Sequence, residues 1–380
     1  MSTVETPAAR RRWALVGAGV ALLVAVLAGG PRVLAVAAVP PTTATPGEVV
    51  ARALASADVP YVARGESRGD LALPDLRGFG DLAALLGGTT STRVWWDGPR
   101  HWRVDAVDPA GERDTYGLAT SVTTWDSGSR RLDVVVGDPS ARLPRPDDLL
   151  APQAARRLLA AVGPQDRLEA LDARRVDGRT TDGVRVVPGD VRSTVERADV
   201  RVDRATGLPL HVEVVGRSGR TSLVSTLHDV AFERPDASVV TPPAPPDARR
   251  GVDRAPDLVA RAATASPWLM PDALAGLTAS GVDVARAPTY GSGLVRVLAL
   301  PLPPRVAGEV VGDASSVGTA EERVPGGAVT RVGSGLLNAA LVRDDDGQHA
   351  YVLVGLVDPA LLDAMAADLL GDPPPPRTMR

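Results

Sequence analysis

The chain has 380 residues, with 42 basic and 46 acidic side chains and a formal charge of −4, and its length suggests two domains or one elaborate one. Apolar residues make up 44% of the chain, which fits a globular protein and excludes a disordered one. The absence of cysteine excludes thiolate zinc sites, cysteine nucleophiles, disulfides and lipobox acyl anchors, and the charge excludes a strongly basic nucleic-acid-binding surface.

The N-terminus predicts export. Arg10–Arg12 precede the uncharged run Trp13–Gly30, which is just long enough to cross a bilayer as a helix. Arginines on this side favour a cytoplasmic N-terminus, so residues 1–39 are predicted to be a transmembrane signal anchor with everything beyond them extracytoplasmic. The alternative is a secreted protein, cleaved near Ala37 at the small-x-small sequence Ala35–Ala37.

The first domain is predicted over residues 47–240. It opens with an amphipathic helix at 47–57, an extended stretch from Tyr61 and a short helix at 81–86. Turn sequences rich in Asp, Gly and Pro then separate short β-prone runs, which predict an antiparallel meander. The expected strands are 92–96, 101–107, 114–120 and 132–136, then, after a helix at 147–162, 184–187, 192–202, 210–215 and 221–232.

A Pro-rich linker is predicted at 241–254, followed by a smaller α+β domain at 255–371 and a disordered tail at 372–380. The sequence 344–347 (DDDG) predicts the turn of the last hairpin. The expected elements of this domain are helices near 271–277, 303–311 and 358–370, and strands near 293–300, 328–342 and 349–356.

The sequence predicts neither catalysis nor a cofactor. The four histidines, His101, His211, His228 and His349, are never closer than 17 positions, which is not metal-ligand spacing. No nucleophile elbow, zinc-protease motif or phosphate-binding loop occurs. We therefore expect a protein that is not an enzyme and that holds no metal.

Tryptophan is concentrated in the meander. Four of the six tryptophans, Trp95, Trp96, Trp102 and Trp125, lie within 31 residues. Each buries a large apolar area and needs a partner for its indole N–H. From the aromatic residues alone, the cluster fits either an ordinary sheet core or the wall of a ligand cavity.

The same region carries a family pattern. Residues 93–105 (RVWWDGPRHWRVD), 114–116 (DTY), 124–128 (TWDSG), 174–179 (RRVDGR) and 200–210 (VRVDRATGLPL) resemble, in this order, motifs of the LolA-like superfamily. The nearest members are the MucB/RseB-type sigma-E regulatory proteins, in particular their actinobacterial, membrane-anchored relatives. The resemblance covers about residues 47–240, and a linker with a smaller C-terminal domain matches the two-domain layout of that type.

The resemblance implies an α+β fold in which a half-barrel of antiparallel strands is covered by helices. The space between sheet and helices would accept an acyl lipid, a lipoprotein or a hydrophobic partner, and the protein would regulate a transmembrane partner such as an anti-sigma factor. The alternatives are a lipid or lipoprotein carrier of the LolA type and a structural wall-associated domain with a collapsed core. The residues predicted to line one continuous wall of the cavity are Val94, Trp96, Trp102, Val104, Trp125, Leu132, Val134 and Val136.

Overall fold

The protein is described from a computed structural model, in which residues 39–71, 85–108, 111–138, 142, 144–255, 268–280, 288–303, 307–308, 312 and 319–375 are placed. The predicted anchor at 13–30 and the cleavage site near Ala37 lie outside these residues. Within the placed residues, none of the helices combines the length and the apolar character needed to cross a bilayer.

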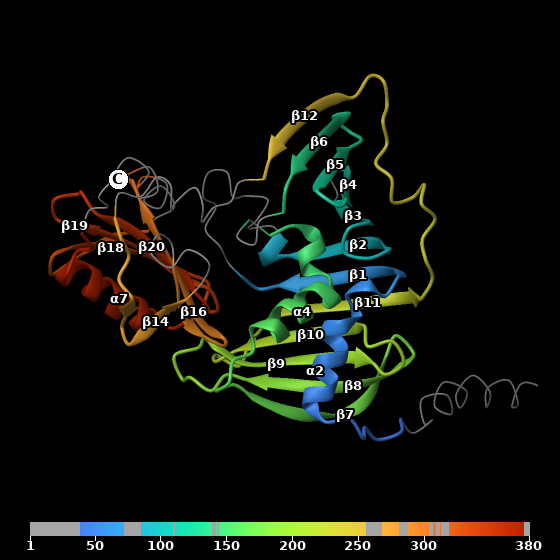
Figure 1. Cartoon of the computed structure of the whole chain (residues 1–380), viewed down its shortest axis with the longest axis horizontal. Coiled ribbons are helices and arrows are strands. Elements are labelled where there is room, and N and C mark those ends of the chain that lie inside the picture. Colours follow the sequence, from blue (N-terminus) through green and yellow to red (C-terminus); the bar gives the residue numbers. More distant parts are fainter. Residues whose placement is uncertain are drawn as a thin grey trace, which may run out of the picture. The chain divides into compact units, whose positions relative to one another are not determined.

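The first sheet has twelve strands in the order β12-β6-β5-β4-β3-β2-β1-β11-β10-β9-β8-β7 (Figure 1). Neighbours pair in antiparallel fashion except β12, which is parallel to β6. The strands are β1 (Tyr61–Gly69), β2 (Thr89–Trp96), β3 (Trp102–Asp108), β4 (Gly111–Gly117), β5 (Ser121–Asp126), β6 (Arg131–Val136), β7 (Arg167–Val176), β8 (Arg179–Val187), β9 (Val195–Asp203), β10 (Pro209–Gly216), β11 (Thr221–Ala231) and β12 (Arg249–Arg254).

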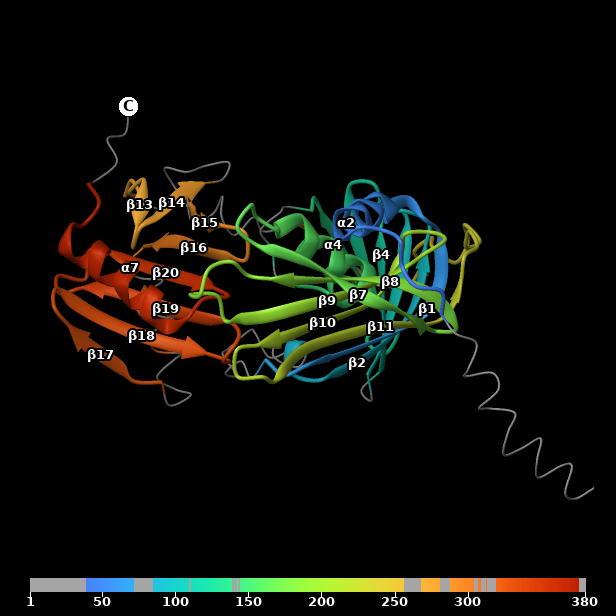
Figure 2. The same ribbon diagram turned by 90° about the horizontal axis from the view of Figure 1, so that it is seen from below.

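The second sheet has eight strands in the order β13-β14-β15-β16-β20-β19-β18-β17, and helix α7 (Pro359–Gly371) packs on it (Figure 2). Asp358 caps α7 by accepting a hydrogen bond from the backbone of Leu361 at 2.8 Å. The strands are β13 (Ala273–Leu274), β14 (Leu277–Ser280), β15 (Thr289–Ser292), β16 (Val295–Leu302), β17 (Glu321–Val324), β18 (Gly327–Gly333), β19 (Asn338–Asp344) and β20 (Ala350–Gly355).

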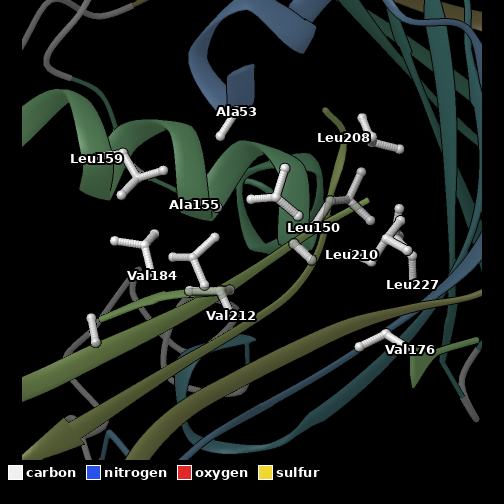
Figure 3. Packing of buried hydrophobic residues seen from close by; sticks show 14 of the residues in the cluster. Ala53, Leu150, Ala155, Leu159, Val176, Val184, Leu208, Leu210, Val212 and Leu227 are labelled. Carbon is white, nitrogen blue, oxygen red and sulfur yellow. The ribbon is translucent and has the colours of Figure 1, made fainter. Parts of the chain in front are cut away.

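Two helices, α2 (Pro46–Ala55) and α4 (Ala151–Ala161), lie on one face of the first sheet (Figures 1 and 2). We call this the inner face and the opposite one the outer face. Each helix is joined to a 3-10 turn, η1 (Ser56–Asp58) after α2 and η2 (Pro146–Leu149) before α4. Helix α4 turns a row of small and apolar side chains to the strands beneath it, shown in Figure 3 against Val184, Leu210 and Val212.

Helix α2 is fixed at both ends. At its start, Thr45 and Glu48 form a capping box, in which the Glu48 backbone donates to the Thr45 hydroxyl at 3.3 Å. Near its end, Arg52 pairs with the buried carboxylate of Asp182 at 2.7 Å, and Arg204 pairs with the other oxygen of the same carboxylate at 2.7 Å. The ion pairs tie α2 to β8 and to the turn after β9.

Most predicted elements of the first domain are present. The helices at 47–57 and 147–162 correspond to α2 with η1 and to η2 with α4, and the expected strands overlap observed ones. Of the helix predicted at 81–86, residues 81–84 lie outside the described part, and Leu85–Gly87 are helical. Strands β5, β7, β15 and β17 have no counterpart among the predicted strands.

The helix predicted near 271–277 is wrong. Strands β13 and β14 pair there as a hairpin, with Leu274 opposite Leu277. The two turn residues, Ala275 and Gly276, have positive φ angles of 46° and 74°, which match the twist of a tight hairpin. A leucine spacing of three, which also fits a helix, here spans a two-residue turn.

The other C-terminal predictions have mixed outcomes. The strand predicted over 328–342 is two strands, β18 and β19, whereas α7 and the turn at 344–347 match. Most of the helix predicted at 303–311 lies outside the described residues. The backbone of Leu269 donates to the Pro375 carbonyl at 3.2 Å, so the start of the predicted disordered tail has a fixed contact, and residues 376–380 lie outside the description.

Part of the segment predicted as a linker is a strand. Residues 249–254 form β12, which pairs with β6 in parallel from Arg249 opposite Arg131 to Arg254 opposite Val136. Its side chains are almost all exposed, including Val252 at 71%. Strand β12 is therefore held mainly by its backbone hydrogen bonds.

Candidate ligand site

Four of the predicted cavity residues come together on the inner face. The register pairs Val94 with Val104 and Trp96 with Trp102, and directly paired residues of antiparallel strands point to the same face. All four side chains are at most 4% exposed and belong to the core beneath α2 and α4. The period-two alternation expected for these two strands is confirmed.

The expected continuation of the wall through Trp125 is wrong. Trp125 pairs with Asp114, and Asp114 pairs with Asp105, which alternates with Val104 and so points to the outer face. The same register places the rest of the predicted wall on the outer face beside Trp125, namely Leu132, Val134 and Val136. Val136 is 42% exposed there.

The inner face carries a stack of three aromatic rings. The centroids of Tyr61 and Trp96 are 6.2 Å apart with planes 18° from parallel, and those of Trp96 and Trp102 are 5.9 Å apart at 12°. The Trp96 indole donates to the Ala57 carbonyl at 2.9 Å, which satisfies its N–H. Gly117 lies under the Trp102 ring, where any side chain would collide with the indole.

Two arginines from the covering elements lie over these rings. The guanidinium carbon of Arg156, on α4, is 6.0 Å from the centroid of Trp96, and that of Arg145, just before η2, is 6.0 Å from the centroid of Trp102. A cation at this distance is attracted by the negative face of an indole ring. The stack is therefore covered by positive charge that belongs to another part of the chain.

An ionic cluster, which we call the roof, holds η2 in place. Asp148 accepts hydrogen bonds from Arg142 at 2.6 and 3.0 Å, from Arg157 at 2.6 Å and from the backbone of Arg145 at 2.8 Å. Asp147 pairs with the Arg145 side chain at 3.0 Å. Both carboxylates are buried, at 5% and 7% exposure, so their charges depend on these partners.

The pKa values of the two roof carboxyls are shifted in opposite directions. Burial, together with the neighbouring charge of Asp148, raises the pKa of Asp147 above its ordinary value. Burial also acts to raise the pKa of Asp148, but hydrogen bonds from Arg142 and the charge of Arg157 outweigh it and hold the pKa below its ordinary value. Asp148 is the acceptor around which the cations of the roof gather.

The outer face of the same strands has its own aromatic and ionic cluster. Arg103 lies between Trp95 and Tyr116, with its guanidinium carbon 5.1 and 5.3 Å from their ring centroids. The same guanidinium pairs with Asp105 at 2.5 Å and with Asp114 at 3.0 Å. Sequence reasoning missed this cluster, although the alternation that places Trp96 inside also places Trp95 outside.

The inner face is closed in this structure. A crevice runs between it and η2, lined among others by Gly65, Thr92, Leu150 and Ser225, and it is too narrow for a water molecule. At Gly65 the two layers approach closely, because a Cβ there would lie 2.8 Å from the Leu150 side chain. An acyl chain can enter here only if η2 and α4 move away from the strands.

A larger cleft of about 440 Å³ lies elsewhere, where the loops around Asp166 and Asp190 meet the β14–β15 hairpin. Both carboxylates are engaged, Asp166 by the backbone of Gly163 at 2.8 Å and Asp190 by Arg192 at 2.7 Å. Nothing in the sequence indicated this cleft. Among the residues that the structure describes, no three histidine or carboxylate groups lie close enough together to bind a metal ion.

Comparison with known proteins gives matches among solved structures only. No family model and no curated protein matches the sequence. Among solved structures, that of the Pseudomonas aeruginosa MucA/MucB complex aligns with 85% of this chain and 97% of its own, at 18% identity and a TM-score of 0.44.

Two shorter structures align with the chain over about half of its length. A LolA superfamily protein from Nitrosomonas europaea covers 53% of this chain and 99% of its own, at 13% identity and a TM-score of 0.25. LprF from Mycobacterium bovis covers 50% and 96%, at 10% identity and a TM-score of 0.29. The solved structures to which this chain is similar thus include a MucA/MucB complex, a LolA superfamily protein and LprF.

Proposed function

We propose that the protein is a non-enzymatic extracytoplasmic sensor that binds an acyl lipid or a lipoprotein and regulates a membrane partner such as an anti-sigma factor. In this proposal the first sheet acts as the half-barrel of the LolA-like superfamily. The acyl chain lies between the inner face and the elements η2 and α4, and binding separates these two layers.

The aromatic stack under the roof carries the proposal. Tyr61, Trp96 and Trp102 present three nearly parallel rings to a helix whose facing side chains are largely small, including Ala151 and Ala155. Flat rings and short side chains leave a smooth apolar surface on both layers when they part. The cations over the rings belong to the covering elements, so they leave with them.

A photoactivatable fatty acid tests the ligand. Full-length protein in membrane vesicles is irradiated with the probe, and the labelled peptides are identified by mass spectrometry. We expect label on the inner-face residues of β1–β3 and on α4. Trp102→Leu should lower the labelling several-fold, because the acyl chain loses contact with an indole ring.

Trp125→Leu is the matched control, since it removes a tryptophan from the outer face of the same meander. It should leave the labelling unchanged, and thermal unfolding of both variants checks that they are folded. Labelling confined to the outer face, or equally reduced in both variants, contradicts the proposed site.

The location and the partner are part of the same proposal. The anchor at 13–30 would hold the protein in the cell membrane as a single-pass protein, with its domains on the side where a transmembrane regulator exposes its extracytoplasmic segment. Co-purification of the tagged full-length protein from membranes should recover an anti-sigma factor. Recovery of no membrane regulator counts against regulation, whatever the ligand.

N-terminal sequencing separates this proposal from a carrier, which must leave the membrane. The sequence Ala35–Ala37 is the observation that favours the carrier, because it provides a cleavage site. A mature chain that begins at Ala38 supports the carrier. An intact start at Met1 or Ser2 supports the anchored sensor.

A further inference from the structure

Two polar side chains at the inner face have no hydrogen-bond partner. The Tyr61 hydroxyl is fully buried, and neither the oxygen nor the nitrogen of the Gln153 amide, in a side chain 9% exposed, is bonded. The Gln153 amide lies close enough to the Tyr61 hydroxyl to lower its pKa as a hydrogen-bond donor does, but the two groups do not meet in good hydrogen-bond geometry. Buried polar groups are nearly always paired, so a pair of unbonded ones at one place needs an explanation.

A cation without a matching carboxylate lies beside them. Arg156 has no carboxylate within ion-pair distance among the described residues, and its only hydrogen bond is a long one of 3.5 Å to Ser56. Burial lowers the pKa of Arg156, with the nearby Tyr61 and Asp58 acting in the opposite direction. Its neighbour Arg157, by contrast, is paired with Asp148 at 2.6 Å.

These three groups share a chemistry. A phenol hydroxyl, a carboxamide N–H₂ and a guanidinium are all donors, and together they suit an anionic oxygen pair, whereas the nearby carboxylate of Asp147 is paired with Arg145. The aromatic stack continues from the same point, because Tyr61 is its first ring and Arg156 lies over its second. Donors at the head of an apolar surface fit a ligand with an anionic head and a hydrocarbon tail.

The charge of the neighbourhood favours a single negative charge. The carboxyl of Asp147 lies near enough to raise the pKa of Tyr61 by its charge, after the larger effect of burial. A doubly charged phosphate would be repelled by Asp147 more strongly than a carboxylate would. A planar carboxylate also matches the fork of a guanidinium.

We propose that Tyr61, Gln153 and Arg156 form a binding site for the carboxylate head of a single-chain amphiphile such as a fatty acid. This inference rests on the proposed function, because the head can enter between Tyr61 on β1 and the α4 side chains Gln153 and Arg156 only when the two layers part, and it then bridges them. It adds that the protein selects free acids over neutral lipids.

Competition tests the selectivity. Full-length protein in vesicles is labelled with the photoactivatable fatty acid while palmitate, hexadecanol or hexadecyl phosphate competes. Palmitate should compete at roughly tenfold lower concentration than hexadecanol, the size of effect expected for hydrogen bonds to a charged group. Hexadecyl phosphate should fall between them.

Variants assign the effect to residues. Tyr61→Phe and Arg156→Met should bring palmitate to within about twofold of hexadecanol, leaving hexadecanol unchanged, because each removes a donor and keeps the apolar contact. Arg64→Met, which removes an exposed arginine from the outer face of β1, is the matched control and should keep the full preference.

The outcomes separate the two proposals. Absence of any labelling overturns the proposed function. Labelling with palmitate and hexadecanol equally effective overturns only the carboxylate site. Stronger competition by the phosphate than by palmitate overturns the choice of a carboxylate, and retained preference in Tyr61→Phe and Arg156→Met overturns the residue assignment.

Discussion

The two faces of the tryptophan meander take their cations from different places. On the outer face, Arg103 belongs to β3 and lies between Trp95 and Tyr116 of the neighbouring strands. On the inner face, Arg145 and Arg156 reach the rings from the covering elements. An arginine within the sheet moves with the ring that it contacts, whereas one on a covering helix can move away. The cation–ring contacts of the outer face are therefore fixed within the sheet, whereas those of the inner face are lost when the covering elements move away.

Truncation of a tryptophan on each face gives the largest expected contrast. Trp102→Ala should lower the free energy of unfolding by about 3–5 kcal/mol, because the ring is 4% exposed in a closed core. Trp125→Ala should cost about 1–2 kcal/mol, because its ring is only partly buried. Urea denaturation measures both. Equal losses would mean that the inner face is already open before any ligand binds.

The roof can be tested through its central carboxylate. Asp148→Ala should cost about 3 kcal/mol, because it leaves Arg142 and the Arg145 backbone without a buried acceptor. Asp138 also pairs with Arg142, at 2.6 Å, but its side chain is 60% exposed. Asp138→Ala should therefore cost less than about 0.5 kcal/mol in the same urea titration. A reversed order would show that the roof is not what holds η2.

The pH dependence of stability gives a further test of the outer face. His211, on the outer face, has its pKa lowered to about 4 by burial, with the charge of Arg174 adding to the effect. The unfolded chain, with an ordinary pKa of about 6.5, therefore binds a proton first as the pH falls. The stability that neutral His211 provides is complete above pH 6.5 and is lost towards pH 4. After allowance for solvent screening we expect a loss of about 1 kcal/mol.

The comparison of His211→Asn with the unchanged protein across this pH range isolates that contribution. The subtraction also removes Asp147, whose raised pKa makes acid stabilising and opposes the histidine. His228→Asn, on the neighbouring strand, controls for the loss of an imidazole. Parallel pH curves for His211→Asn and the unchanged protein would contradict the role of His211.

The smallest contrast concerns two tyrosine hydroxyls. Tyr116→Phe should cost about 1 kcal/mol, because the outer hydroxyl donates to Asp114 at 3.4 Å. Tyr61→Phe should change the free energy of unfolding by less than about 0.5 kcal/mol in either direction, because the inner hydroxyl has no partner to lose. Thermal unfolding resolves the difference. A clear loss in Tyr61→Phe would reveal a bonded hydroxyl.

Local patterns predicted the strands of the meander but not how they combine. Turn sequences located β2, β3 and β6, and alternation gave the face of each residue within one strand. The relation between strands depends on where each turn closes. Trp125 was assigned to the wrong face because its strand, β5, was not predicted, so its register with β4 and β6 was unknown.

The candidate site was harder to predict, because it is defined by buried polar groups that have no hydrogen-bond partner, and a sequence pattern does not show which groups are unpaired. Tyr61 opens a strand and Gln153 is in a helix nearly a hundred positions away, so no local pattern links them. One signal was available in the helix itself. Ala151, Ala155 and Leu159 recur at a spacing of four and mark its buried side, and Arg156 lies immediately beside that side.

Strand β12 has a mechanical consequence. The chain passes through it on the way from the first sheet to the second, and it is anchored at its two ends by Arg249 donating to the Arg130 carbonyl at 2.9 Å and Ala255 donating to the Val136 carbonyl at 2.8 Å. Parallel pairing is slightly weaker per residue than antiparallel pairing, and the exposed side chains of β12 add little burial. The C-terminal part of the chain is also bonded directly to the loop before β9, for example through Asp358 donating to the Arg192 carbonyl at 2.8 Å, and once those contacts are broken tension acts on β12. A pull strong enough to peel β12 from β6 would lengthen the connection between the sheets while both remain folded, as an extensible tether does.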